Sequence, residues 1–206
     1  KGCNQEHLFQ VFTQEEWDAY PFADEEKMKW FKDAKLGLFF HVGISAVGGV
    51  DIGWSRHTHK LPDPGEGFIP DEEYDNWAKM LKMEEFNAGE WIDLAVRGGF
   101  KYVVIITKHH DGFHMWDTQY SDYKITNAPM GRDYLKELTD ACHARNMPVG
   151  LYYSQRDWHH EDYEPIDTNA AVRCQEIPYF KMKQGEKWKY GARHPRYIKY
   201  MHDTVM

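Results

Sequence analysis

The stretch "FKYVVIITKHHDG", residues 100–112, is the part of the sequence from which the fold follows. Its first eight residues are apolar almost throughout, which predicts a strand buried on both faces, as in a parallel sheet. Four titratable residues and a glycine follow this strand directly: Lys108, His109, His110, Asp111 and Gly112. Titratable side chains gathered where a buried strand ends are typical of an active or binding site.

Strands and helices alternate on both sides of this stretch. Apolar runs predict two further buried strands, at residues 35–43 and 147–154. Amphipathic periodicity and capping residues predict helices at residues 24–34, 87–99, 132–146 and from 194 onward. Residues 44–74 contain several glycines, three prolines and many polar groups, and are expected to form a long loop. The alternation indicates parallel strands joined by crossover helices.

Two architectures contain such units. No GxGxxG or Walker loop follows any predicted strand, so nothing favours a nucleotide-binding doubly wound sheet. Long polar segments after each strand favour an α/β fold of the (β/α)8 TIM-barrel type, in which functional residues lie at the carboxyl ends of the strands. A complete barrel needs roughly 250 residues, so this chain would supply about the first three or four βα units. Because an open half-barrel exposes a strand edge, we expect the chain to be part of something longer or to need a partner.

Composition narrows the classes of partner. The net charge is −8 and no basic stripe occurs, which argues against a nucleic-acid or anionic-membrane partner. No apolar run approaches the length of a membrane span. The chain holds 8 Trp, 13 Tyr and 11 Phe, and such flat apolar rings with polar edges suit the binding of sugars. The three cysteines form no CxxC pair, and their odd number argues against a disulfide framework.

The first residues carry a localisation hypothesis. Residues 1–23 read as a polar N-terminal leader without the apolar segment of a cleavable signal peptide. The start "KGCNQ" fits the mature end of a bacterial lipoprotein whose lipid is attached to Cys3, and the alternative is a tail with a free thiol. We therefore expect a periplasmic, cell-surface or secreted protein.

Three runs of the sequence resemble glycoside hydrolase family 29, the alpha-L-fucosidases. They are "KLGLFFHVG" (35–43), "FKYVVIITKHHDGFHMWDTQYSDY" (100–123) and "GRDYLKELTDACHARNMPVGLYYSQRDW" (131–158). The resemblance covers about residues 24–158 and resumes at "RYIKYMHDTV" (196–205). It implies that residues 24–206 are the N-terminal portion of the glycosidase (β/α)8 catalytic domain, with a β-sandwich beyond the barrel. It also implies exo-acting release of terminal alpha-linked L-fucose from an oligosaccharide or glycoconjugate, with retention of configuration and without a cofactor.

By the same resemblance, five residues would line the fucose pocket: His41, Trp54, His109, His110 and Tyr152. A neutral histidine donates from one ring nitrogen and accepts at the other, which matches a sugar hydroxyl. Adjacent strand residues face opposite ways, so His109 and His110 both face inward only if the strand has ended by His110. Asp111 is expected to bond loop backbone, and Gly112 to supply an unusual φ.

The sequence departs from the family pattern at the first strand and after it. Val42 stands where the family has Trp after the first-strand histidine, and Gly53 stands where it has Glu before Trp54. The two carboxyl groups of a retaining glycosidase are not expected here either. The family's nucleophile ends the fourth strand and its acid/base follows, so both are expected after Met206. These residues alone are therefore expected to be inactive.

Three other functions remain open from the residues. A metal-dependent TIM-barrel hydrolase would use the histidine runs at 57–59, 109–110 and 159–160. However, the His-x-His of such enzymes lies at the first strand, where this chain has "HVG", so no metal is expected. A non-catalytic carbohydrate-binding protein would fit the missing carboxylates and the aromatic content. A related glycosidase for alpha-galactose would fit the departures at Val42 and Gly53. No oligomeric state is predicted.

Overall fold

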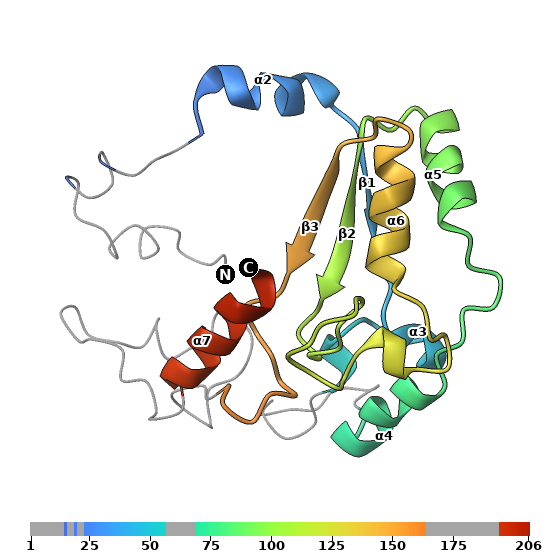
Figure 1. Ribbon diagram of the computed structural model, residues 1–206, viewed down its shortest axis with the longest axis vertical. Coiled ribbons are helices and arrows are strands. Elements are labelled where there is room, and N and C mark those ends of the chain that lie inside the picture. The colour runs from blue at the N-terminus through green and yellow to red at the C-terminus, as the bar shows by residue number, and fades with distance from the viewer. Residues whose placement is uncertain (1–14, 16–18, 20–22, 57–68, 164–193) are drawn as a thin grey trace, which may run out of the picture.

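The computed structural model describes residues 15, 19, 23–56, 69–163 and 194–206 (Figure 1). Most of the predicted leader, including Cys3, lies outside the described residues, as does the histidine run at 57–59. No helix within the described ranges is long and apolar enough to cross a membrane.

Three strands form one parallel sheet in the order β1 (Gly37–Phe40), β2 (Tyr102–Lys108) and β3 (Val149–Tyr153). Leu38 pairs with Val103, and Val103 in turn pairs with Val149. The predicted parallel strands are therefore confirmed, each shorter than the apolar run that predicted it. The described residues form an open sheet of three strands and not a closed barrel.

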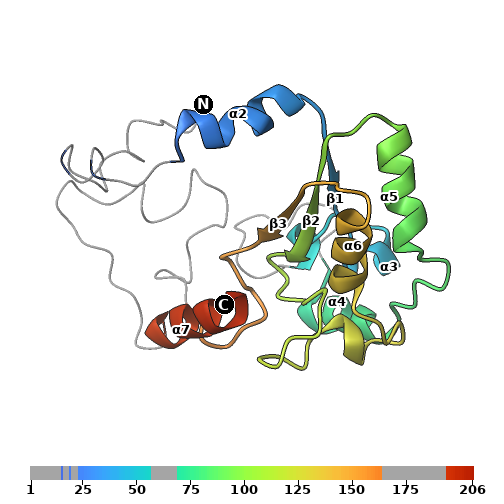
Figure 2. The ribbon, with the colours of Figure 1, turned by 45° about the horizontal axis from the view of Figure 1, so that its top comes forward.

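Four longer helices surround the sheet: α2 (Glu25–Ala34), α5 (Ala88–Arg97), α6 (Tyr134–His143) and α7 (His194–Val205). Helices α5 and α6 cover one face (Figures 1 and 2). Helix α2 lies across the amino ends of the strands, where the rings of Trp30 and Phe31 contact Tyr102. Helix α7 lies near the carboxyl end of β3, and its Tyr197 hydroxyl donates to the Gln155 carbonyl at 2.8 Å.

Side-chain caps fix where the helices begin. Asn87 precedes α5 and its side chain accepts a hydrogen bond from the backbone N–H of Glu90, as the predicted capping box requires. Asp133 caps α6 in the same way by accepting from the N–H of Lys136 at 2.8 Å. Each cap satisfies an N–H that the first turn of a helix leaves without a partner.

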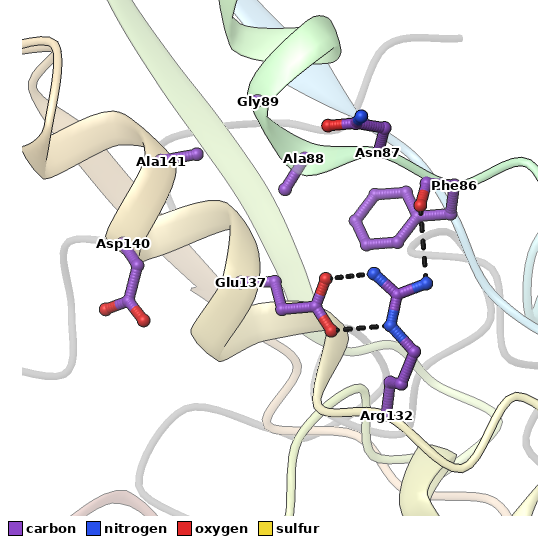
Figure 3. A pocket seen from close by; sticks show the side chains of 8 residues that line it. All are labelled: Phe86, Asn87, Ala88, Gly89, Arg132, Glu137, Asp140 and Ala141. Carbon is purple, nitrogen blue, oxygen red and sulfur yellow. Dashed lines mark hydrogen bonds and ion pairs between the residues drawn. The ribbon is translucent and has the colours of Figure 1, made fainter.

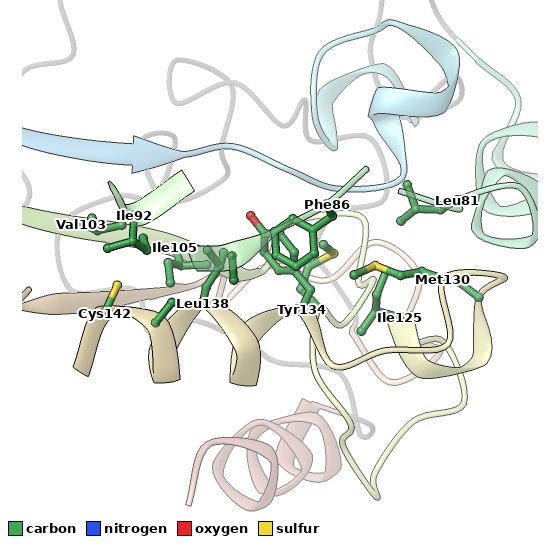
Figure 4. Packing of buried hydrophobic residues seen from close by; sticks show 14 of the residues in the cluster. Leu81, Phe86, Ile92, Val103, Ile105, Ile125, Met130, Tyr134, Leu138 and Cys142 are labelled. Atoms are coloured by element: carbon green, nitrogen blue, oxygen red, sulfur yellow. The ribbon is translucent and has the colours of Figure 1, made fainter. Parts of the chain in front are cut away.

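The core lies between β2 and the two covering helices (Figure 4). Val103 and Ile105 alternate along β2 toward the helices, and both are fully buried. Ile92 of α5 and Leu138 of α6 meet them and are also fully buried. This apolar layer holds β2 rigidly, so the residues that follow Lys108 leave the sheet from a fixed point.

The prediction that residues 44–74 form a long loop is wrong for the described part of this range, which contains short helices. It contains α3 (Ser45–Gly48), the 3-10 helix η2 (Trp54–Arg56) and the first turn of α4 (Asp71–Asn76), which η3 (Trp77–Lys79) continues. A further 3-10 helix, η4 (Ile125–Asn127), follows β2. Such short helices have little stability of their own, and α4 is held because Tyr74 is fully buried in the core.

Candidate functional site

The carboxyl ends of the strands bring the predicted pocket residues together. His109 and His110 follow β2, and their rings stack with centroids 4.2 Å apart. Tyr152 of β3 stacks on His109 at 5.7 Å, and Trp54 of η2 meets His110 edge-on at 5.0 Å. His41 follows β1 and joins through Phe39, whose ring lies 4.2 Å from His41 and 5.8 Å from Tyr152. We call His41, Trp54, His109, His110 and Tyr152 the histidine cluster.

The end of β2 explains why both histidines join one cluster. The strand stops at Lys108, and the N–H of Gly112 donates to the His109 carbonyl at 3.1 Å, which closes a turn. Gly112 has φ of 78°, a conformation that glycine adopts without strain, and Asp111 accepts from the N–H of Phe113 at 3.1 Å. The expected roles of Asp111 and Gly112 in shaping the turn are thus confirmed.

Burial keeps the two stacked histidines neutral. It lowers the pKa of His109 to about 4 and that of His110 to about 3. The charge of His41 adds a smaller lowering of the His109 pKa, and the charge of His109 does the same for His110. Near neutral pH each ring therefore offers one N–H donor and one nitrogen acceptor. That pairing suits uncharged hydroxyl groups better than an anion.

Lys108 belongs to a different arrangement from the histidines it precedes. Its side chain is fully buried, and Nζ lies 2.9 Å from Oδ2 of Asp157 and 4.8 Å from the centre of the Tyr153 ring. The other carboxylate oxygen of Asp157 accepts from the backbone N–H groups of His159 and His160. This pair fixes the loop after β3. Its two partners are 49 residues apart in the sequence, so no local pattern could have predicted it.

The loop after β3 adds one aromatic residue to the predicted set. Trp158 lies edge-on to Trp54 at 5.4 Å and to His110 at 5.1 Å. The backbone N–H of Trp158 donates to the His110 carbonyl at 2.8 Å. Nothing in the local sequence indicates that this loop folds back onto the end of β2, so Trp158 was not among the predicted site residues.

A buried hydrogen-bonded chain connects the Trp54 segment to the same strand end. The Tyr74 hydroxyl donates to Oδ2 of Asp111 at 2.9 Å and accepts from the N–H of Gly53 at 2.8 Å. Gly53 has φ of 71°, and a Cβ there would lie 2.4 Å from Nδ1 of His109. The backbone therefore passes His109 too closely for any side chain at position 53, which makes the departure at Gly53 a packing requirement of this chain.

Two recesses formed by described residues lie outside the cluster. One, of about 740 Å³, is lined by residues of α4 and by Tyr123 and His159, whose rings stack at 4.0 Å. The carboxylate of Asp75 on its wall accepts hydrogen bonds from Nε and Nη2 of Arg56. The other, of about 390 Å³, lies at the starts of α5 and α6 (Figure 3). Arg132 on its wall donates to Glu137 and to the Phe86 carbonyl, and Asp140 pairs with Lys136 of the same helix.

Within the described ranges, no group of three or more His, Cys, Asp or Glu side chains is placed to hold a metal ion. The described site thus places two neutral imidazoles, those of His109 and His110, among aromatic rings at the carboxyl ends of parallel strands. This arrangement defines an α/β protein suited to binding a hydroxyl-rich ligand.

The comparisons with known proteins agree with this class. The family model described as Alpha-L-fucosidase matches residues 5–203, so the chain belongs to the alpha-L-fucosidase family. Plasma alpha-L-fucosidase of Homo sapiens is 34% identical over 161 residues, which cover 74% of this chain and 34% of the human protein. The chain thus spans about a third of the length of the curated relatives it matches.

Solved structures give the same result. Alpha-L-fucosidase isoenzyme 1 from Paenibacillus thiaminolyticus matches with a TM-score of 0.68 at 32% identity, over 88% of this chain and 39% of that one. Alpha-L-fucosidase AlfC from Lactobacillus casei, in complex with alpha-L-fucose product, matches with a TM-score of 0.59 at 29% identity. That match covers 84% of this chain and 51% of the other.

Proposed function

We propose that this chain is the sugar-binding part of an exo-acting, retaining alpha-L-fucosidase. The observation that carries the proposal is the convergence of neutral His109 and His110 with Trp54 and Tyr152 at one strand end, in a chain of the alpha-L-fucosidase family. The two imidazoles would hydrogen-bond hydroxyls of a terminal alpha-linked fucose, with His41 beside them. Trp54, with 41% of its surface exposed, would stack on an apolar face of the sugar.

These residues would position the sugar rather than break the bond. Retaining hydrolysis needs a nucleophilic carboxylate and a carboxylic acid/base roughly 5 to 5.5 Å apart. Asp111 and Asp157 are the buried carboxylates nearest the cluster, and both are committed to structural hydrogen bonds. We therefore assign both catalytic groups to other parts of the whole protein.

The whole domain is proposed to be a (β/α)8 barrel whose N-terminal portion is formed by residues 24–206. Three consecutive parallel strands with covering helices support this, as does the exposure of apolar side chains on the two edge strands. Phe39 of β1 is 42% exposed and Leu151 of β3 is 56% exposed. Neighbouring barrel elements would cover both. The periplasmic, cell-surface or secreted location, with a lipid on Cys3, stays a proposal from the sequence.

The test is hydrolysis of nitrophenyl glycosides by the full-length protein. We expect release of nitrophenol from the alpha-L-fucoside, with no loss of activity after treatment with a chelator. Release from the alpha-galactoside alone would assign the site to another sugar. Activity that is lost to chelator and restored by zinc would replace the proposal with a metal-dependent hydrolase.

A further inference from the structure

Ser154 connects the end of β3 to one histidine of the cluster. It is the first residue after β3, it is only 3% exposed, and its N–H donates to the Lys108 carbonyl at 2.9 Å. Its Oγ lies 2.5 Å from Nδ1 of His110. The same oxygen lies 2.9 Å from the carbonyl oxygen of Arg156 and 3.1 Å from the Arg156 nitrogen.

These three contacts determine where the protons lie. A serine hydroxyl has one proton to donate and can accept two hydrogen bonds. If the hydroxyl donates to the Arg156 carbonyl, Oγ accepts from the N–H of Arg156 and from an N–H at Nδ1 of His110, and all three contacts are hydrogen bonds. If the hydroxyl donated to Nδ1 instead, two oxygens would face each other at 2.9 Å without a proton between them. The first arrangement is therefore the stable one.

We propose that Ser154 is a positioning residue that fixes His110 as the Nδ1–H tautomer, so that the lone pair of Nε2 can accept a hydrogen bond from a hydroxyl of the bound sugar. The part concerning the sugar rests on the function proposed above. Because burial lowers the pKa of His110 to about 3, the ring is neutral and Nε2 is an acceptor across the whole physiological range. The site would then reject a ligand that offers only an acceptor at that position.

The surrounding loop holds both atoms of this contact in place. The Lys108 ammonium lies 3.2 Å from the Arg156 carbonyl, which also accepts from Ser154, and it pairs with Asp157. On the other side, the N–H of Trp158 donates to the His110 carbonyl. The Ser154 side chain cannot turn away without losing its bonds to Arg156, and the Trp158 N–H holds the backbone from which the His110 ring projects.

The adjacent histidine provides an internal contrast. Nδ1 of His109 is buried and has no hydrogen-bond partner among the described residues. Although the two rings are stacked, the described residues fix the tautomer of His110 only. No described hydrogen bond at Nδ1 sets the tautomer of His109, so a bound ligand would select it.

The first experiment reads the tautomer without any sugar, so its result is independent of the proposed function. The full-length protein, labelled with ¹⁵N in histidine, would be studied by NMR at neutral pH, with the His110 signals identified by their loss in His110→Asn. We expect a protonated Nδ1 and an unprotonated Nε2. A protonated Nε2 in the wild-type protein would overturn the proposal.

Two variants separate tautomer control from general destabilisation. Ser154→Ala removes the acceptor and is expected to replace the single tautomer with a mixture. Thr107→Val removes a comparable buried hydroxyl that donates to the Tyr152 carbonyl at 2.9 Å and does not touch His110. It should leave the His110 signals unchanged, and an equal change in both variants would contradict a specific role for Ser154.

The second experiment measures competitive inhibition by L-fucose and by its deoxy and deoxyfluoro derivatives at each hydroxyl in turn. Fluorine can accept but cannot donate, so at the position bound to His110 both replacements should weaken inhibition alike, by about tenfold. This penalty should shrink to threefold or less in Ser154→Ala. If fluorine were tolerated better than hydrogen at every position, the acceptor role would be excluded, while fucoside turnover by the same protein would still uphold the function.

Discussion

At the scale of single residues, neighbours in the sequence have opposite roles. Lys108, His109 and His110 follow one another, yet Lys108 enters a buried ion pair while the two histidines stack in the cluster. The strand ends at Lys108, and the two histidines lie in the turn that Gly112, with its positive φ, closes. Lys108 therefore belongs to a structural ion pair, whereas His109 and His110 belong to the proposed binding site.

Replacing His110 tests the binding pair. His110→Ala removes the ring that stacks on His109 and faces both Trp54 and Trp158, so kcat/KM for nitrophenyl alpha-L-fucoside should fall at least about tenfold, equivalent to one lost hydrogen bond. The matched control is His143→Ala, which removes an exposed histidine at the end of α6. Equal activity of the two variants would remove His110 from the site.

Buried histidines also predict how stability depends on pH. Burial lowers the pKa of His109 and His114 to about 4 and that of His110 to about 3, whereas the unfolded chain takes up these protons near pH 6.5. Their stabilising contribution is therefore present above about pH 6.5 and is lost as the pH falls toward 4. Asp111 opposes this, since burial raises its pKa to about 6, but three histidines outweigh one carboxyl group.

The measurement is the melting temperature of the full-length protein at pH 7 and at pH 5. It should be lower at pH 5, and His114→Gln should show a smaller difference because one buried histidine is gone. His143→Gln, at an exposed position, should behave like the wild type. A melting temperature that rises between pH 7 and pH 5 would contradict the prediction.

At the scale of elements, the loop after β3 is held by buried hydrogen bonds and an ion pair. Asp157 accepts from two successive N–H groups, as a helix N-cap residue does, and it pairs with a lysine from the neighbouring strand. A Cβ on Gly112 would lie 2.4 Å from Oδ1 of Asp157, so the turn after β2 and this loop fit against each other. The two strand ends thus support each other, and Trp158 is held at the cluster as a result.

Breaking the buried pair should therefore be costly. Lys108→Met leaves Asp157 buried without its cation, and the free energy of unfolding should fall by about 3–5 kcal/mol. The double variant Lys108→Met/Asp157→Asn keeps the oxygen that accepts from the loop and removes the uncompensated charge, so it should recover part of the loss. Lys136→Met breaks an exposed pair with Asp140 on α6 and should cost at most about 1 kcal/mol. A similar loss in both single variants would exclude the buried pair as a special support.

At the scale of the whole molecule, the described sheet has two open edges. Strands β1 and β3 each lack a second neighbour among the described residues, and each carries an exposed apolar side chain, Phe39 or Leu151. The histidine cluster lies at the end of this open sheet, and the buried carboxylates nearest to it among the described residues, Asp111 and Asp157, are both engaged in structural hydrogen bonds. Stability and catalysis are therefore both expected to depend on further barrel elements.

Expression of these 206 residues by themselves tests that dependence. We expect self-association through the open edges on size-exclusion chromatography and no release of nitrophenol from the alpha-L-fucoside. The full-length protein serves as the positive control for both measurements. Turnover by the 206 residues alone would show that they hold the nucleophile, and the assignment of both catalytic groups to other parts of the protein would then be wrong.

Much of the fold and of the cluster could be predicted, because the signals are local. The apolar run before Lys108, the capping residues at Asn87 and Glu90 and the helical periodicity indicate these elements without reference to the rest of the chain. Parallel strands bring their carboxyl ends to one edge, so residues directly after β1 and β2 and at the end of β3 were expected to meet. The short helices between 44 and 74 were missed because tertiary contacts, such as those of Tyr74, stabilise them rather than their own sequence.

The sequence by itself determined the alternating strands and helices, the resemblance to one family, and the residues that converge at the strand ends. Only the tertiary structure decided which side chains serve which purpose. Lys108 meets Asp157 across 49 residues, and His110 meets Ser154 across 44. The physical reason is that the register of β2 against β3 and the turn at Gly112 set these contacts, and neither is encoded in the identity of the residues that touch.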